Sequence, residues 1–333
     1  MAKNDYTEGS GNYKNDRLHR ALAKIAEVAS QAIDGGEVFE EYEWGEEQNG
    51  QERAPGCVIK PLPTRLLIKA AQVAAAINPA NAPVLGPLAA VMRDELELTP
   101  ARLAVITSKY WGPAPRKMTV SFMESTPTDL KARIIKYMNK WNKTTGISFV
   151  ETGGTGDVRI SRGPGGYWSY LGTDNSLVPK NRQTMNLEGF TMETEESVYR
   201  RVVPHETGHF LGSPHEHMRK ALVARIDREK AFKWFWEQYR WDRATVIAQV
   251  LTPLDEASLM GTPSDQTSIM CYQLPGIITK DGKPIPGGPD INPTDYAFMG
   301  KIYPKLGHAA AAQEEEWNVS EDVEVEFAQS ALM

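Results

Sequence analysis

The chain has 333 residues, of which 41% are hydrophobic, and its net charge is −6 at pH 7. This length and apolar content exclude a disordered chain and predict one large or two modest domains with a buried core. The sequence has no long apolar run and no signal-like N-terminus, so we expect no membrane association and a cytoplasmic or non-classically exported protein. With only Cys57 and Cys271, no disulfide framework is expected.

Acidic residues gather at the C-terminal end of the chain. Residues 309–333 contain seven Asp and Glu but no Lys or Arg, whereas the remainder holds 37 basic and 36 acidic residues. A nearly neutral body lacks the electrostatic footprint of nucleic-acid binding, and we therefore expect no nucleic-acid partner. We interpret residues 309–333 as a solvated acidic tail, with a partner-binding motif around Trp317 as the alternative.

Residues 1–108 are interpreted as an N-terminal extension with no fold signature of its own. Three prolines around Cys57, in RAPGCVIKPLP, exclude a long helix or a central strand there. The Ala-rich residues 66–76 predict a helix, and residues 91–106 predict one helix, or two with a break before Pro100.

Residues 109–308 are interpreted as one domain that begins with a sheet. Alternating or short apolar runs predict strands at 117–122, 147–152, 157–162, 163–173 and 184–192. A helix is expected to start with Thr126 as its N-cap and to bury a stripe at helical spacing, namely Leu130, Ile134, Met138 and Trp141. Further helices are predicted at 227–240 and at 290–304, the latter started by Asn292-Pro293. The order of these elements predicts an α+β fold.

Four of the six histidines fall within thirteen residues: His205, His209, His215 and His217. In His205-Glu206-x-x-His209 on a helix, the two imidazoles project from one face and can hold one zinc ion. A turn at Gly212 would bring in His215 as the third ligand. Three imidazoles leave a coordination position open for water, whose proton Glu206 can take. A chance match to the motif in a metal-free helix is the alternative.

Three motifs together resemble the astacin group of the metzincin zinc peptidases. They are HETGHFLGSPHEHMR, the Met-turn sequence SIMCY, and YWSYLG ahead of TMNL. The resemblance covers roughly residues 109–304. It implies an upper subdomain with the sheet and the active-site helix, a lower, mostly helical or irregular subdomain, and a substrate cleft between them.

The resemblance also implies roles for individual residues. His205, His209 and His215 would bind one catalytic zinc ion, with Glu206 as general base and acid. Met270 would form the hydrophobic floor of the site. Tyr272 would be a fifth zinc ligand or a stabiliser of the oxyanion. In the same pattern, Glu216 lies under the active site and can meet an amino terminus freed by activation.

Some positions depart from the astacin pattern. Tyr167 stands where the cysteine before WSY is expected, and Cys271 replaces a Met-turn histidine. His217 matches an astacin position, but three histidines already complete the protein side of a catalytic zinc site, so we expect it beside the ligands or at the surface.

Substrate binding is expected at a sheet edge, where a peptide can add a strand. The segment that contains Tyr167, Trp168 and Ser169 resembles the edge strand of astacins, although core aromatic residues are the alternative for Trp168 and Tyr170. Gln273, with Leu274 and Pro275, would line the pocket after the cleaved bond.

The sequence therefore predicts a zinc-dependent endopeptidase that acts on peptides or proteins. An inactive peptide-binding module that keeps the cleft is the alternative, against which the presence of Glu206 argues. Two interpretations stay open for Cys57. It is either an incidental thiol or a latency residue. In the second case Cys57 would belong to an inhibitory prosegment and bind the catalytic zinc ion, since zinc binds thiolate well.

Overall fold

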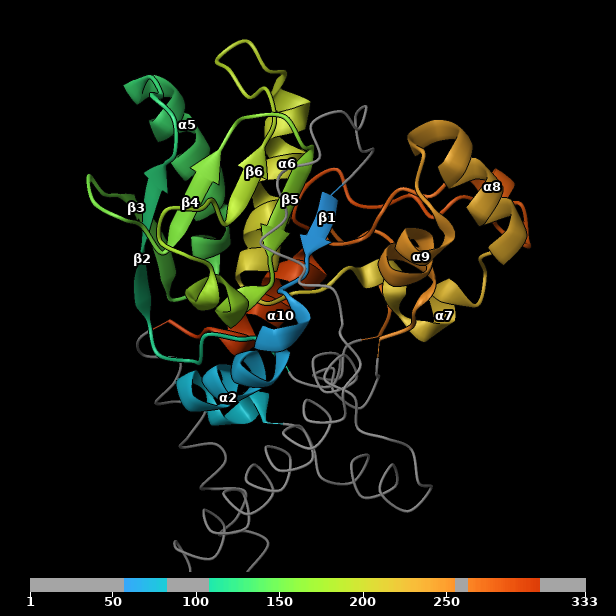
Figure 1. The fold of residues 1–333 in the computed structure, drawn as a ribbon, viewed down its shortest axis with the longest axis horizontal. Helices are drawn as coiled ribbons and strands as arrows, with labels where there is room; N and C mark the ends of the chain where they lie inside the picture. The colour runs from blue at the N-terminus through green and yellow to red at the C-terminus, as the bar shows by residue number, and fades with distance from the viewer. Residues whose placement is uncertain (1–56, 83–107, 255–262, 306–333) are drawn as a thin grey trace, which may run out of the picture.

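The computed structural model describes residues 57–82, 108–254 and 263–305, which contain a mixed sheet flanked by helices (Figure 1). The helix predicted at 91–106 and the acidic tail lie outside the described residues. The strands within these ranges are β1 (Cys57–Lys60), β2 (Arg116–Phe122), β3 (Ile147–Glu151), β4 (Val158–Ser161), β5 (Tyr167–Tyr170) and β6 (Met185–Leu187). The longer helices are α2 (Leu67–Ile77), α5 (Thr128–Met138), α6 (Glu196–Phe210), α8 (Arg228–Tyr239) and α10 (Pro293–Ile302). The shorter ones are α7 (Lys220–Val223), α9 (Arg243–Val246) and the π-helix η6 (Ile247–Leu251).

The sheet has the strand order β1-β5-β6-β4-β2-β3. Among these described strands, β5 and β6 pair antiparallel, and every other neighbouring pair is parallel. Helices α5 and α6 pack against each other and against strands of the sheet. All five strands predicted in residues 109–308 are confirmed, and so is the α+β class.

The helix after β2 shows where a local pattern was correct and where it was not. All four residues of its predicted stripe are buried: Leu130, Ile134, Met138 and Trp141. The predicted N-cap was wrong by one residue, because Pro127 holds that position. The Thr126 hydroxyl donates to the Glu124 carbonyl, and no side-chain hydrogen bond caps the start of this helix.

The helical part that follows α6 has its own apolar core. Phe235 and Trp241 stack with ring centroids 5.2 Å apart, and they pack with residues of the Met-turn region such as Tyr272 and Leu274. Figure 1 shows α7, α8 and α9 grouped on one side of the sheet. In the part of the chain that the structure describes, every helix is too short or too polar to cross a membrane.

The N-terminal segment, which we define as residues 57–82, lies against the domain at several places. Strand β1 pairs in parallel with β5, in the register Cys57 to Tyr167 and Lys60 to Tyr170 (Figure 1). Leu62 is buried in a small cluster with Trp168 and Tyr170. The edge of β5 that the sequence analysis assigned to substrate is therefore occupied by this chain's own segment.

The end of this segment is fixed by Asn81, which is 1% exposed. Its amide group donates to the Ala74 and Tyr110 carbonyls at 3.0 and 2.7 Å, and its side-chain oxygen accepts from the Tyr110 amide at 2.9 Å. Helix α2 also packs against the 3-10 helix η4 (Gly172–Leu177). The segment is thus held by a strand, a helix and a buried asparagine.

Candidate metal centre and active site

Helix α6 presents His205 and His209 on one buried face. Close packing sets the position of this face, because a Cβ on Gly208 would lie 2.4 Å from the Met270 sulfur. Glycine therefore allows the Met-turn, Ser268–Tyr272, to approach the helix directly. The helix ends at Phe210, and Gly212 follows with φ +98°, a conformation that favours glycine. The chain then turns back and brings His215 to His209.

The three imidazoles converge with the Cys57 thiol. One potential ligand atom from each of the four residues lies within 4.8 Å of all the others, and all four residues are buried. The Nε2 atoms of His209 and His215 are 3.1 Å apart. The Nδ1 atom of His205 contacts the Ile269 carbonyl at 2.6 Å, and that of His209 contacts the Ser213 carbonyl at 2.7 Å. These contacts assign Nδ1 as the protonated atom and leave Nε2 free as a ligand.

This donor set fits zinc. A tetrahedral ion with Zn–N distances of about 2.05 Å has ligand nitrogens about 3.3 Å apart, close to the separation of His209 and His215. The buried Nε2 atom of His205 has no hydrogen-bond partner among the described residues. A bond to a metal ion would give this nitrogen lone pair a partner. Imidazole and thiolate are both ordinary zinc ligands.

Burial keeps these imidazoles in the neutral form that a metal needs. It lowers the pKa of His205 to about 4, and it holds the pKa values of His209 and His215 well below their usual range. The neighbouring histidines lower the last two further, because a second positive charge nearby is unfavourable.

Glu206 is fully buried beside the ligands. Its Oε2 accepts a hydrogen bond from the Cys57 thiol at 2.9 Å, and its Oε1 has no partner among the described residues. Desolvation by burial raises the pKa of Glu206 well above its usual value. Burial also raises the pKa of Cys57, and the Glu206 carboxylate adds to that rise. The thiol and the carboxylate therefore share a proton-bearing contact at the centre of the site.

Tyr272 lies at the same centre, with its ring 4.5 Å from that of His215 between centroids. Its hydroxyl is buried and has no hydrogen-bond partner among the described residues. Burial raises the pKa of this phenol, so it stays protonated and can donate. A buried donor without a partner next to a metal-binding cluster is suited to donate a hydrogen bond to an acceptor on a bound substrate.

His217 is buried, with its ring centroid 5.2 Å from that of His215, so of the two expected locations the structure shows the one beside the ligands and not the surface. Its ring lies 4.6 Å from Tyr272, and its Nε2 contacts the Gln249 carbonyl in η6 at 3.0 Å. It lies outside the cluster of potential metal ligands.

The remaining predicted site residues lie on both sides of this centre. Trp168 and Ser169 in β5 are buried, and Tyr167 is half-buried against the Phe190 ring. Gln273 is exposed just after the Met-turn. Residues 57–60 cover the free side of β5, so the part of the site assigned to substrate is in contact with the N-terminal segment.

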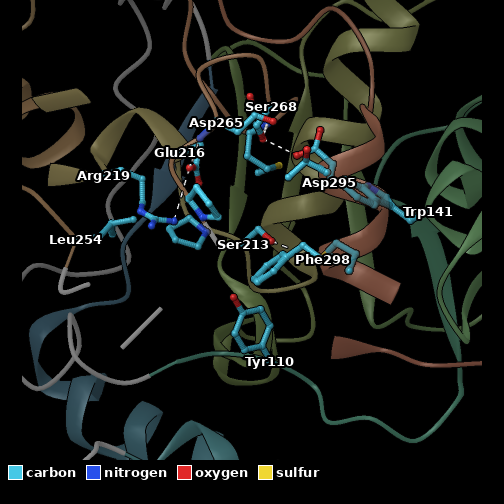
Figure 2. Close-up of a pocket in the computed structure, with 15 residues that line it drawn as sticks. Tyr110, Trp141, Ser213, Glu216, Arg219, Leu254, Asp265, Ser268, Asp295 and Phe298 are labelled. Atoms are coloured by element: carbon cyan, nitrogen blue, oxygen red, sulfur yellow. Dashed lines mark hydrogen bonds and ion pairs between the residues drawn. The ribbon is translucent and has the colours of Figure 1, made fainter. Parts of the chain in front are cut away.

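A cavity of about 50 Å³ lies next to the Met-turn, lined by Glu216, Asp265, Ser268 and Asp295 among others (Figure 2). Burial raises the pKa of Glu216 to about 7, although its Oε1 accepts from the Asp265 amide at 2.9 Å. Arg219 approaches the same carboxylate at 3.7 Å. The cavity is therefore lined by several acids and one nearby guanidinium group.

The sequence analysis missed Asp295, which is 8% exposed. It forms a capping box with Asn292 at the start of α10, and its carboxylate binds the Met-turn. The signal for the cap was in the sequence Asn-Pro-Thr-Asp. No local pattern indicates that the same carboxylate reaches a turn some 26 residues earlier.

The chain is similar to known peptidases. The family model of the astacin peptidases matches residues 105–283. A curated astacin-like metalloendopeptidase from Coturnix japonica is 25% identical over 181 residues, which cover 51% of this chain and 39% of that protein. The chain thus spans well under half the length of that relative. The solved structure of myroilysin is 26% identical with a TM-score of 0.55, and the match covers 59% of this chain and 96% of that one. Because the family model covers more than half of the chain, the chain belongs to the astacin family of metallopeptidases.

Proposed function

We propose that the chain is a zinc-dependent endopeptidase that hydrolyses internal bonds of peptides or proteins. The observation that carries this proposal is the buried convergence of His205, His209 and His215 beside a carboxylate that is not part of the ligand set. Three imidazoles are typical of catalytic rather than structural zinc sites. Bound there, zinc would supply a Lewis acid that polarises the scissile carbonyl and lowers the pKa of water to about 7.

The residues of this chain then divide the work of proton transfer and charge stabilisation. Glu206 takes the proton of the attacking water and passes it to the leaving amine, for which its raised pKa is suited. Tyr272 donates a hydrogen bond to the oxygen that becomes negatively charged. Met270 packs beneath the helix at Gly208 and keeps the ligand face in place.

The experiment that tests the proposal measures two properties in the same sample. Zinc content should be about one ion per chain, and an unfolded protein substrate should be cleaved once the N-terminal segment has been removed. A chelator should abolish cleavage, and added zinc should restore it. A protein that binds zinc but cleaves nothing under these conditions would instead be the inactive peptide-binding module.

His215→Ala should lose both metal and activity. Removing one of three ligands opens the site to water and leaves two imidazoles, so we expect zinc affinity to fall by at least about 10²-fold. Equilibrium dialysis against zinc checks this, with His217→Ala as the matched control outside the ligand set. Full zinc retention in His215→Ala would mean that the third ligand lies elsewhere.

Tyr272→Phe should lower kcat by about 10²-fold with little change in KM. A donor that acts mainly on the transition state has this signature, because the ground-state complex does not use it. Steady-state kinetics of the processed protein on a fluorogenic peptide would separate the two constants. An unchanged kcat would return Tyr272 to a packing role against His215.

We further propose that the N-terminal segment keeps the enzyme latent. Two contacts support this role: the Cys57 thiol lies among the metal ligands and on Glu206, and β1 occupies the edge of β5. A thiolate on the zinc ion would replace the catalytic water, and the strand would exclude a peptide substrate. The interpretation of Cys57 as an incidental thiol does not account for these contacts.

The acid-lined cavity fits the second half of such an activation. A chain cut just before Ser108 has its new ammonium group two residues from Tyr110 in the sequence, and Tyr110 lines the cavity together with Glu216 (Figure 2). An ammonium group there would pair with Glu216 and favour its charged form, which burial disfavours. We propose that this pairing stabilises the processed enzyme.

A further inference from the structure

The Met-turn joins a zinc-ligand candidate to a buried carboxylate in α10 through a continuous chain of hydrogen bonds. The Nδ1–H group of His205 donates to the Ile269 carbonyl at 2.6 Å. The other end of that peptide group, the Met270 N–H, donates to the Ser268 hydroxyl at 3.0 Å. The hydroxyl in turn donates to Asp295 Oδ1 at 2.6 Å, and Figure 2 shows this last contact.

All donors in this chain point the same way, from the imidazole to the carboxylate. Hydrogen bonds arranged in this manner polarise one another in a buried environment, so the negative charge on Asp295 makes the Ile269 carbonyl a stronger acceptor. A stronger acceptor at Nδ1–H makes the opposite nitrogen, Nε2, a better metal ligand. The carboxylate thus acts on the metal site without contacting it.

Asp295 is itself held firmly, which a positioning role requires. Its second oxygen accepts from the Ile269 and Asn292 backbone amides at 2.9 and 3.0 Å. Its own backbone amide donates to the Asn292 side chain at 2.8 Å, which completes the capping box of α10. The carboxylate therefore fixes the Met-turn to the start of the last helix.

Among the residues that the structure describes, the other two imidazoles have no such connection. His209 donates to the Ser213 carbonyl, and the nitrogen of that peptide group belongs to Pro214, which has no hydrogen to donate onward. The Nδ1 atom of His215 has no hydrogen-bond partner among the described residues. His205 is therefore distinguished from the other ligand candidates by its link to a charged group.

We propose that Asp295 is a positioning residue for His205, acting through Ser268 and the Ile269–Met270 peptide group to orient this imidazole and strengthen it as a zinc ligand. The inference rests on the proposed zinc site. It gives helix α10 a part in metal binding, although none of the sequence motifs of the site includes this helix.

The test compares variants that interrupt the chain of hydrogen bonds from His205 to Asp295 with one variant that only weakens the cap of α10. Ser268→Ala removes the central link, and Asp295→Asn keeps the shape while removing the charge. Asn292→Ala removes the capping side chain but leaves the chain from His205 to Asp295 intact. In the full-length protein, competition with a chromophoric chelator measures zinc affinity, and urea unfolding of the zinc-free protein measures stability.

We expect Ser268→Ala and Asp295→Asn to weaken zinc binding by about tenfold or more, the scale typical of partners that orient metal ligands. Ser268→Thr, which keeps a hydroxyl, should restore most of the affinity. Asn292→Ala should lose stability and keep the zinc affinity of the wild type. The proposal would be overturned if Asn292→Ala lost as much zinc affinity as these two variants. It would also be overturned if Ser268→Ala and Asp295→Asn both kept the zinc affinity of the wild type.

A second readout does not need zinc. In the zinc-free protein, NMR of labelled histidine should show His205 protonated at Nδ1, with a downfield proton that moves upfield in Ser268→Ala and Asp295→Asn. Absence of that shift would overturn the inference. Failure of the wild type to bind zinc at all would instead overturn the proposed function, so the two failures are distinguishable.

Discussion

Glu206→Gln should bind about one zinc ion per chain and lose turnover by about 10²- to 10⁴-fold, the range expected when a general base and acid is removed. The amide has nearly the same shape as the carboxylate, so packing in this fully buried site is retained. It cannot accept the proton of water. The zinc ligands are not altered, because Glu206 is not one of the clustered residues.

The measurement pairs metal analysis with the initial rate of peptide cleavage after the N-terminal segment has been removed. Glu237→Gln is a suitable control, since this residue lies on the exposed side of α8 and only approaches Lys233 at 3.9 Å. Comparable turnover in Glu206→Gln and in the wild type would reject Glu206 as the catalytic base. Loss of zinc together with activity would point to a ligand role instead.

Cys57→Ser should raise the activity of the full-length protein by at least about tenfold, and cleavage between residues 82 and 108 followed by removal of the N-terminal segment should raise it further. A hydroxyl binds zinc more weakly than a thiolate, so the substitution frees the position that water needs. It leaves β1 paired with β5, and the effect is therefore smaller than that of removing the whole segment. Rates of cleavage of a fluorogenic peptide measure both effects.

The second buried thiol provides the control. Cys271→Ser changes the same chemical group at a position outside the cluster of potential ligands, and it should not activate the full-length protein. Activity of the intact wild type that already equals that of the cleaved protein, with no change in Cys57→Ser, would mean that the N-terminal segment is not inhibitory.

The sequence predicted those features that depend on neighbours along the chain. Helix α6 carries His205, Glu206 and His209 at a spacing that fixes their common face before any tertiary contact forms. Strand β2 follows a two-residue alternation, and the approximate positions of the later strands followed from short apolar runs. The motif residues converge because Gly212 permits a turn that is itself local.

Contacts between distant residues were beyond such patterns. Prolines around Cys57 restricted β1 to an edge position, but they carry no information about which strand it joins. Its pairing with β5 and the contact between Cys57 and Glu206, 149 residues apart, depend on tertiary packing. The link from Asp295 to the Met-turn could not be predicted for the same reason. The sequence of a capping box is the same whether or not its carboxylate has a second partner.

The broad attachment of the N-terminal segment changes what a single cut would achieve. Its contacts run from Cys57 at the metal site, through Leu62 among apolar side chains, to Asn81 on the backbone of Tyr110. A cut after Asn81 leaves every one of them intact. While the chain is whole, the segment faces its site at a fixed, high effective concentration, whatever the amount of protein present. Once the chain is cut, the same contacts join two separate molecules, so occupancy of the site falls as the protein is diluted.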